Sequence, residues 1–422
     1  MNTIPLITSD TELFETVREF VVPEDDGFDG VHLLSNPDDA IEYLNLEMPS
    51  LLVIDFSSTF DAYGVLDKIM TDPWLLHGGI IALSNDRDDL ERLEEVRGAN
   101  VVAILTRPRL TQELPRVLSI ISRNRRLLIQ REVGTDLVRD LSGSFQLEND
   151  PLEATCYLNL ICNLLHNSNK IGTDKKNQLR LCLDEMLNNA IEHGNCGITH
   201  EQKSAWLEDG KWVSDLVKER CADPKIAKRR VTLEYVATPT SSRFFVADEG
   251  DGFDWRAVRV EADPLKSHGR GISMTEVFAK NLTYNEKGNE VRFEFENQQD
   301  EATETPAVFE HIEPRDVIED EVIYAQGESS DFLYYIVKGR YDVSVNGESV
   351  AALSPDDLLM GEMSFLLNKR RSATVRAQSP GCLIEISRKR FVEAIRRKPH
   401  YALLLCRLLA QRLQRTSAIL SG

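Results

Sequence analysis

Two polar residues four positions apart, Glu185 and Asn189, are the first candidates for chemistry in this chain. They lie in residues 178–195, whose apolar side chains repeat with the period of an α-helix. Residues four apart on a helix are neighbours, and these two share the polar face with Asn188 and Glu192. A carboxylate beside a carboxamide can orient a hydroxyl group and can bind Mg²⁺ through oxygen. A solvated helix face without function is the alternative.

An acidic residue and two glycines follow the strand expected at residues 243–247. Asp248 stands at the end of this strand, where its carboxylate can accept a hydrogen bond from an exocyclic amine. Gly250 and Gly252 come directly after it, and glycine permits positive φ and close approach of the backbone to a ligand. The segment therefore favours a binding site over a solvated turn.

A further glycine pair, Gly269 and Gly271 with Arg270 between them, opens a helical pattern that runs to Ala279. A glycine-rich turn at a helix N-terminus presents backbone N–H groups and the positive end of the helix dipole. This combination suits a phosphate group.

Another candidate site lies towards the C-terminus. Gly361 and Glu362 open a short helical pattern, and Arg371 follows nine residues after the glutamate. Short alternating strands and an Asn346-Gly347 turn around this segment predict a β-barrel. Backbone N–H groups and the arginine fork suit a phosphodiester, and the glutamate suits a ribose 2′-hydroxyl. The alternative is a cupin-like barrel with an incidental surface arginine.

An asparagine-bearing helix, a DxGxG motif and a GxG motif, in that order, resemble the N, G1 and G2 boxes of the GHKL ATPase superfamily. The resemblance covers about residues 135–297, and the spelling DEMLNNAIEHGN is most similar to the anti-sigma-factor serine kinase branch. It implies a Bergerat-type α/β sandwich that binds ATP and Mg²⁺.

By this resemblance, Glu185 is the general base that activates a protein hydroxyl, and Asn189 is the Mg²⁺ ligand. Asp248 accepts a hydrogen bond from the adenine amino group, beside the adenine-shaping Gly250 and Gly252. The resemblance further implies a lid that wraps the phosphates, formed by Gly269, Arg270 and Gly271.

The barrel segment resembles the phosphate-binding cassette of cyclic-nucleotide-binding domains, over about residues 307–420. The match implies that Arg371 pairs with the cyclic phosphate, that Glu362 takes the ribose 2′-hydroxyl and that Ser372 contacts phosphate or base. Gly361 opens the cassette. The implied ligand is cAMP or cGMP, and Ser372 is compatible with either.

The first 125 residues alternate short apolar runs with amphipathic helical patterns, which predicts a doubly wound parallel sheet. They resemble a response-regulator receiver domain, in which a strand-end aspartate, here Asp55, accepts phosphate. The family's lysine is replaced by Arg107, and its acidic pair is reduced to Asp10. We therefore expect a pseudo-receiver used for docking or dimerisation, with phosphorylation of Asp55 as the alternative.

These patterns divide the chain into three domains with two seams between them. We expect a receiver-like domain at 1–125, an ATP-binding domain at 126–297 and a cyclic-nucleotide-binding domain at 307–422. Residues 126–145 are expected to carry a helix from the first domain into the second, and the polar run 297–306 is expected to be a linker. The fold class is thus multidomain α/β and α+β, ending in a β-barrel with C-terminal helices.

Composition excludes several classes of function. The formal net charge of −20 disfavours nucleic acid and anionic membranes as partners, because binders of nucleic acid usually present a basic face. We find no signal peptide, no bilayer-spanning apolar run and no helix-turn-helix after the barrel. The seven cysteines form no CxxC pair and indicate reduced, mostly buried thiols of a cytoplasmic bacterial protein.

Two functional hypotheses follow. The first is a cyclic-nucleotide-regulated serine/threonine kinase that phosphorylates an anti-sigma-antagonist-like or sigma-factor-like partner. Histidine autophosphorylation is not expected, because His166 and His193 lie within the ATPase pattern and no dimerising hairpin carries a histidine. The second is a non-enzymatic switch that binds ATP and cyclic nucleotide and sequesters a partner. The C-terminal helices over 390–420 are expected to pack on the barrel, with a homodimer contact as the alternative.

Overall fold

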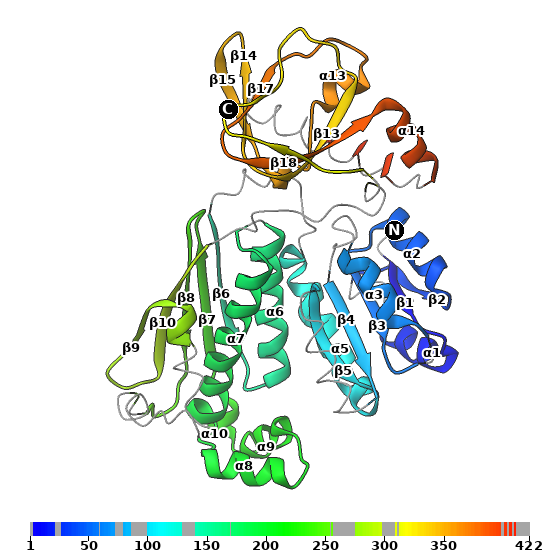
Figure 1. The fold of residues 1–422 in the computed structure, drawn as a ribbon. Coiled ribbons are helices and arrows are strands. Elements are labelled where there is room, and N and C mark those ends of the chain that lie inside the picture. The colour runs from blue at the N-terminus through cyan, green and yellow to red at the C-terminus, as the bar shows by residue number, and fades with distance from the viewer. Residues whose placement is uncertain are drawn as a thin grey trace.

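The fold is described from a computed structural model (Figure 1). The described residues are 3–21, 27–58, 60–71, 79–85, 99–128, 140–168, 170–253, 255, 275–297, 309, 312–397, 401–402, 405–406 and 409–410. Within them the strands form two five-stranded and two four-stranded sheets.

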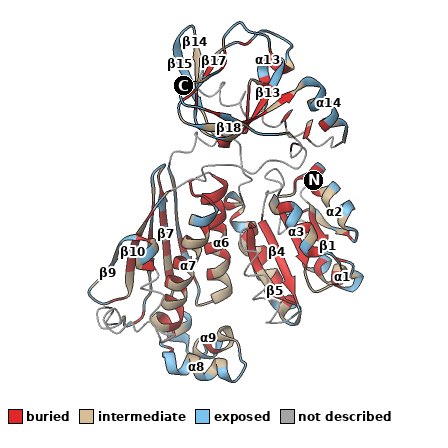
Figure 2. Ribbon diagram, viewed as in Figure 1, coloured by how far each residue is buried: buried red, intermediate tan, exposed pale blue. Residues whose placement is uncertain are grey.

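The first sheet is parallel, in the order β2-β1-β3-β4-β5. Its strands are β1 (Thr3–Ile7), β2 (Gly30–Leu34), β3 (Leu51–Asp55), β4 (Gly79–Ser84) and β5 (Val101–Thr106). The central strands are almost continuously apolar and buried, as expected for a sheet covered on both faces (Figure 2). One face packs on α1 (Thr11–Phe20) and α5 (Leu110–Arg123), and the other on α2 (Pro37–Glu47) and α3 (Ala62–Thr71).

The second sheet is antiparallel, in the order β6-β7-β8-β10-β9. Its strands are β6 (Leu141–Leu147), β7 (Val231–Ala237), β8 (Ser241–Ala247), β9 (Lys280–Tyr284) and β10 (Glu290–Glu296). Two long helices, α6 (Pro151–Asn167) and α7 (Thr173–Asn189), lie between this sheet and the first one (Figure 1). A π-helical turn, η3 (Ala190–Asn195), continues α7.

Three short helices follow that turn as an insertion before β7. They are α8 (His200–Glu208), α9 (Val213–Arg220) and α10 (Pro224–Ala227). A Thr199 capping box, reciprocated by Gln202, starts α8. The insertion contacts the segment that follows β5 of the first sheet: Arg109 in that segment donates a hydrogen bond to Asp215 of α9.

The barrel consists of two sheets, β11-β18-β13-β16 and β12-β17-β14-β15. Its strands are β11 (Arg315–Val317), β12 (Val322–Tyr324), β13 (Phe332–Lys338), β14 (Tyr341–Val345), β15 (Glu348–Leu353), β16 (Leu359–Met360), β17 (Thr374–Ala377) and β18 (Gly381–Ser387). The β14–β15 turn has positive φ at Asn346 (53°) and Gly347 (88°), as the Asn-Gly signal predicts. Helix α13 (Glu362–Leu366) lies between β16 and β17, and α14 (Arg388–Arg397) follows β18.

The end of the described chain packs on its own barrel. Tyr401 and Leu405 are buried in one cluster with Leu333 and Ile384 of the barrel, and Leu409 packs against it. This agrees with the expectation that the C-terminal stripe packs on the barrel. Leu413 and Leu420 of the same stripe lie outside the described residues.

The structure differs from the sequence expectation at two strands. The segment expected to continue as a helix to residue 145 is a strand from Leu141 onward, where it pairs with β7. Strand β2 was not among the expected strands, since GVHLL is only partly buried at the sheet edge and has a weak apolar pattern. All seven cysteines are free in the structure, and four of them are buried. No helix in the described part of the chain is long and apolar enough to cross a membrane.

Candidate functional site

A cavity of about 320 Å³ lies where α7, η3 and the ends of β8 and β10 meet. Its lining includes three residues singled out from the sequence: Glu185, Asn189 and Asp248. Gly252 also lines it. The helix and the strand end, about 60 residues apart in the sequence, thus contribute to one cavity.

Helix α7 presents Glu185 and Asn189 because its other face is buried in the core. Leu179, Leu183 and Leu187 are fully buried, as the helical period predicts. The side-chain nitrogen of Asn189 donates a 2.9 Å hydrogen bond to Glu185 Oε1. This bond fixes the carboxamide so that its carbonyl oxygen is left to accept or to ligate.

Glu192, the fourth residue expected on the polar face of the helix, lies elsewhere in the structure. Glu192 does not line the cavity but is buried, 3% exposed, with its carboxylate 2.7 Å from Lys203 of α8. The π-helical turn adds a residue to the helical repeat, so positions after Asn189 rotate relative to an α-helix. The expectation that Glu192 shares the polar face is therefore wrong.

Asp248 is held in a narrow place beside two glycines. A Cβ added to Gly194 would lie 2.3 Å from the side-chain carboxyl carbon of Asp248. A Cβ added to Gly250 would lie 1.9 Å from the Gly194 carbonyl oxygen. Any side chain at either position would collide with its neighbour. The Gly250 N–H donates to Asp248 Oδ1 at 2.8 Å.

Burial raises the pKa of Asp248 to about 6, against the opposing effect of the Gly250 N–H and of Lys287. The carboxylate is therefore ionised at neutral pH but at a cost in solvation. A hydrogen-bond donor in the cavity, such as an exocyclic amine, would stabilise the charged form.

Gly252 has φ of +78°, and a Cβ on it would meet the Lys287 carbonyl oxygen at 1.9 Å. The Lys287 ammonium in turn donates to the Gly250 carbonyl at 2.7 Å. These contacts hold the DxGxG loop against the β9–β10 turn. They leave no room for a side chain at Gly252, as the Gly194 carbonyl leaves none at Gly250.

Aromatic and polar residues that sequence reasoning missed complete the cavity. Tyr284 at the end of β9 packs edge-on against Phe253 and stacks on Trp255. Asn289 Nδ2 donates to the Asp248 carbonyl oxygen at 2.7 Å, and His200 at the start of α8 also lines the cavity. The signal available in the sequence was weak, because these residues lie outside the three motifs.

The phosphate-side residues Gly269, Arg270 and Gly271 lie outside the described residues. Their roles therefore stay a prediction. Among the described residues no cluster of three or more His, Cys, Asp or Glu could hold a metal ion.

In the barrel, Gly361 and Arg371 are in contact. Gly361 has φ of +79° and precedes α13, and a Cβ on it would lie 2.4 Å from an Arg371 nitrogen. Arg371 is 3% exposed and donates to the Gly361 carbonyl at 2.9 Å and to Ser364 Oγ at 3.1 Å. Its guanidinium lies 4.2 Å from the centroid of Tyr324.

The guanidinium of Arg371 is buried with its Nε atom lacking a hydrogen-bond partner. Its backbone is held by the turn at Gly327, whose N–H donates to the Arg371 carbonyl. A buried cation with an unsatisfied N–H is suited to an anionic ligand. Glu362 is buried at the start of α13, directly after Gly361, and Ser372 is exposed.

Asp55 at the end of β3 is 0% exposed, and its carboxylate accepts several hydrogen bonds. Thr8 Oγ1 donates to Oδ2 at 2.6 Å, Arg107 donates to the same oxygen at 2.7 Å, and the Ser57 N–H donates to Oδ1 at 3.1 Å. Arg107 also bonds to Asp10 at 2.6 Å, and this contact lowers the pKa of Asp10.

Comparison with family models finds two matches. Residues 157–295 match the histidine kinase-like ATPase domain, and residues 314–398 match the cyclic nucleotide-binding domain. The first match contains Glu185, Asn189 and Asp248, and the second contains Glu362 and Arg371.

Comparison with curated proteins finds transcriptional regulators that match part of this chain. The cAMP-activated global transcriptional regulator CRP of Pasteurella multocida is 36% identical over 101 residues, 23% of this chain and 48% of that protein. CRP of Salmonella typhimurium is 38% identical over 98 residues, 22% of this chain and 46% of that protein. The chain thus spans about half the length of the curated relatives it matches.

Among solved structures, the catabolite activator protein of Thermus thermophilus is 29% identical, with a TM-score of 0.25, over 27% of this chain and 55% of that one. The EAL enzyme Bd1971 is 28% identical, with a TM-score of 0.21, over 25% of this chain and 98% of that one.

Two separate sites, a lined cavity on α7 and a buried arginine in the barrel, thus coincide with two matched domains. This pairing supports a nucleotide-regulated, ATP-binding signalling protein. The chain carries a GHKL-type, histidine kinase-like ATPase domain followed by a cyclic nucleotide-binding domain.

Proposed function

We propose that this chain is a cytoplasmic, cyclic-nucleotide-regulated serine/threonine kinase of the anti-sigma-factor type. Its substrate is a partner-switching protein, anti-sigma-antagonist-like or sigma-factor-like. The observation that supports this most is the cavity that Glu185, Asn189 and Asp248 line together. A base, a metal-ligating oxygen and an adenine acceptor are the groups that such a kinase needs in one place.

ATP would bind with its adenine amino group donating to Asp248 and its phosphates towards Gly269, Arg270 and Gly271. The residues present also fit Mg²⁺, because the Asn189–Glu185 hydrogen bond uses the amide nitrogen and leaves hard oxygen donors. Asn189 would hold the ion, which, when bound, neutralises charge on the phosphates. A site with few protein ligands suits Mg²⁺, which keeps waters and phosphate oxygens in its shell.

In the transfer step, Glu185 would accept the proton of a partner serine or threonine hydroxyl. That oxygen forms a bond to the γ-phosphorus while the bond from phosphorus to the leaving oxygen of ADP breaks. The hydrogen bond from Asn189 orients the glutamate for this role. The chain contributes mainly positioning and charge stabilisation, as is general for phosphoryl transfer.

The barrel would act as the sensor for cAMP or cGMP, with Arg371 on the cyclic phosphate, Glu362 on the ribose 2′-hydroxyl and Ser372 on the phosphate or base. The buried, unsatisfied Arg371 Nε supports an anionic ligand there. We propose the three-domain division 1–125, 126–297 and 307–422.

The test is transfer of labelled γ-phosphoryl from ATP to candidate antagonist proteins. Glu185→Gln should abolish labelling while Mg-ATP binding remains, because the amide cannot accept the proton. The matched control is Glu219→Gln on the exposed face of α9, which should label as the wild type does. Unchanged labelling by Glu185→Gln would exclude Glu185 as the base.

The second candidate is a non-catalytic switch that binds both nucleotides and sequesters a partner. The bonding of Asp55 favours it, because an aspartate whose oxygens accept from Thr8, Arg107 and Ser57 is poorly placed to take up phosphate. We propose that the first domain is such a pseudo-receiver and serves for docking. Tight Mg-ATP binding without any phosphoprotein product would support the switch over the kinase.

A further inference from the structure

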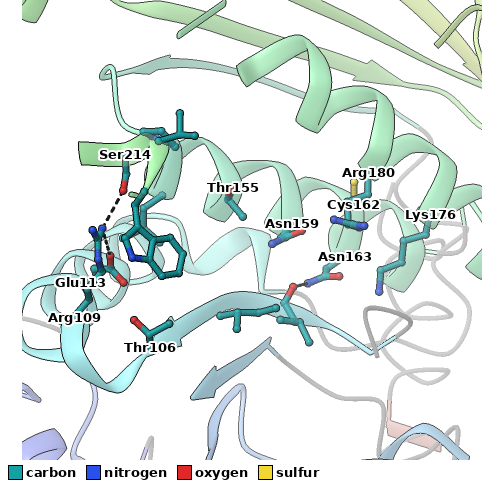
Figure 3. A pocket seen from close by; sticks show the side chains of 16 residues that line it. Thr106, Arg109, Glu113, Thr155, Asn159, Cys162, Asn163, Lys176, Arg180 and Ser214 are labelled. Atoms are coloured by element: carbon teal, nitrogen blue, oxygen red, sulfur yellow. Dashed lines mark hydrogen bonds and ion pairs between the residues drawn. The ribbon is translucent and has the colours of Figure 1, made fainter. Parts of the chain in front are cut away.

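A second cavity, of about 310 Å³, lies where strand β5 meets α6, α7 and α9 (Figure 3). Strand β5 is the last strand in the order of the parallel sheet. None of the residues that line this cavity lines the one around Asp248. It is therefore a separate site, formed by the junction of the first sheet with the ATPase-like domain.

Two asparagines of α6 explain why the junction is open. Asn159 Nδ2 donates to the Val102 carbonyl at 3.0 Å, and Asn163 Nδ2 donates to the Val101 carbonyl at 3.4 Å. Asparagine side chains, rather than another strand, thus donate hydrogen bonds to carbonyl groups of β5. Because these side chains lie between the two elements, the backbone of α6 stays away from the strand. Further along the strand, Ile104 is only partly buried and lines the cavity.

The charged groups around the cavity differ between its two ends (Figure 3). At one end Arg109 donates to Asp215 at 2.5 Å and pairs with Glu113 at 3.6 Å, so acidic groups compensate its charge. At the other end lie Lys176 and Arg180, both from α7. This end is the cationic one.

Arg180 is the residue in the cavity with an unmet bonding requirement. Its Nε atom is buried and has no hydrogen-bond partner. The Arg180 side chain as a whole is only partly buried and lines the cavity, so its guanidinium is a cationic group available to a ligand oxygen there. The nearby Lys176 ammonium, 2% exposed, donates to the Ala99 carbonyl at 3.2 Å and to Asn100 Oδ1 at 3.1 Å.

Burial lowers the pKa of Lys176 to about 8, so at neutral pH it still carries its proton. Two cationic groups thus stand at one end of a cavity whose wall also includes the apolar side chains of Ile104, Leu152 and Trp212. A volume of about 310 Å³ is within the range of small-molecule sites, which occur preferentially between domains.

We propose that this cavity binds a small organic carboxylate, with the carboxylate group at Arg180 and the apolar body against Trp212 and Ile104. A cationic group at one end of the cavity and apolar side chains in its wall match one oxyanion on an apolar molecule. This is a third ligand site, independent of the ATP and cyclic-nucleotide sites.

The experiment is calorimetry of the full chain with phenylacetate, its neutral isostere phenylacetamide, and inorganic phosphate. Phenylacetate should bind at least about tenfold more tightly than the amide, because only the anion gains a charge-assisted bond to Arg180. It should also bind more tightly than phosphate, which has no apolar body.

Two variants locate the site. Arg180→Gln should weaken phenylacetate binding by about tenfold or more, and Thr155→Leu should weaken it by filling the cavity while Arg180 stays. The control is Arg123→Gln on the exposed side of α5, which should bind phenylacetate as the wild type does. Thermal unfolding of each variant without ligand checks that it is folded.

Three results would overturn the proposal. They are the absence of saturable phenylacetate binding at millimolar concentration, equal affinity for the acid and the amide, and unchanged affinity in folded Arg180→Gln.

Discussion

Replacing Asp248 by asparagine should have opposite effects on stability and on ATP binding. The asparagine has nearly the same shape and its Oδ1 can still accept the Gly250 N–H, so the change removes mainly the charge. Burial raises the pKa of Asp248 from 3.8 to about 6, a shift of about two pKa units. Two units correspond to at most about 3 kcal/mol, and we expect about 1–2 kcal/mol because part of the carboxylate is solvated.

The sign follows from the direction of the shift. A carboxyl group whose pKa is higher in the folded state favours folding while it is protonated, and this contribution is lost as pH rises from about 4 through about 6. The asparagine at position 248 in the variant carries no charge at any pH. The variant should therefore be as stable as the wild type near pH 4 and more stable, by about 1–2 kcal/mol, above pH 7.

ATP binding should respond the other way. Above pH 7 the variant should bind Mg-ATP about tenfold or more weakly, because a hydrogen bond to a charged acceptor is replaced by one to a neutral acceptor. The ratio of the two affinities should approach one as pH falls below about 6, where Asp248 is protonated. Protonation of ATP affects its affinity for both proteins equally, so it does not change the ratio of the two affinities.

The assay is urea unfolding between about pH 4 and pH 8 and calorimetry with Mg-ATP between about pH 5 and pH 8, each on both proteins. A stability difference that does not change with pH would refute the assigned titration. An affinity ratio near one at pH 8 would refute the contact between Asp248 and adenine.

Two further predictions concern other sites. Gly250→Ala should abolish Mg-ATP binding measured by calorimetry, because its Cβ would lie 1.9 Å from the Gly194 carbonyl oxygen; retained affinity would contradict the close packing of this loop. Arg107→Gln should lower the free energy of unfolding by about 3 kcal/mol, because it leaves the fully buried Asp55 carboxylate without its cation. Adding Asp55→Asn to Arg107→Gln should restore part of that loss in urea unfolding, and a purely additive double variant would contradict the coupling.

The candidate ATP site was predictable in its motifs because each motif has a local physical cause. The helical period placed Leu183 and Leu187 in the core and hence Glu185 and Asn189 on the other face. The glycines were visible because positions such as Gly252, with φ of +78°, exclude other residues.

Other features depend on long-range contacts and had no local signal. Glu192 is buried because a π-helical turn rotates it towards Lys203 of an insertion, and no period in the sequence marks such a turn. Tyr284 and Asn289 enter the cavity through strand pairing of β9 and β10. The parallel first sheet was visible in its buried central strands, whereas β2 at the edge was not.

The junction cavity was also invisible in the sequence. It depends on where α6 comes to lie against β5, which Asn159 and Asn163 determine by bonding to carbonyl oxygens about 60 residues away. Asparagine on a helix gives no indication of its partner, because it can bond equally well to water.

The central claim, a nucleotide sensor joined to an ATP site, is tested most directly by calorimetry with cAMP and cGMP, with and without Mg-ATP. We predict saturable binding of one of the two, lost in Arg371→Ala, and an affinity that changes when Mg-ATP is present, by a coupling of about 1–3 kcal/mol. Arg376→Ala, an exposed arginine of β17, is the control and should bind normally. Binding of neither nucleotide, or equal binding by Arg371→Ala, would contradict the account.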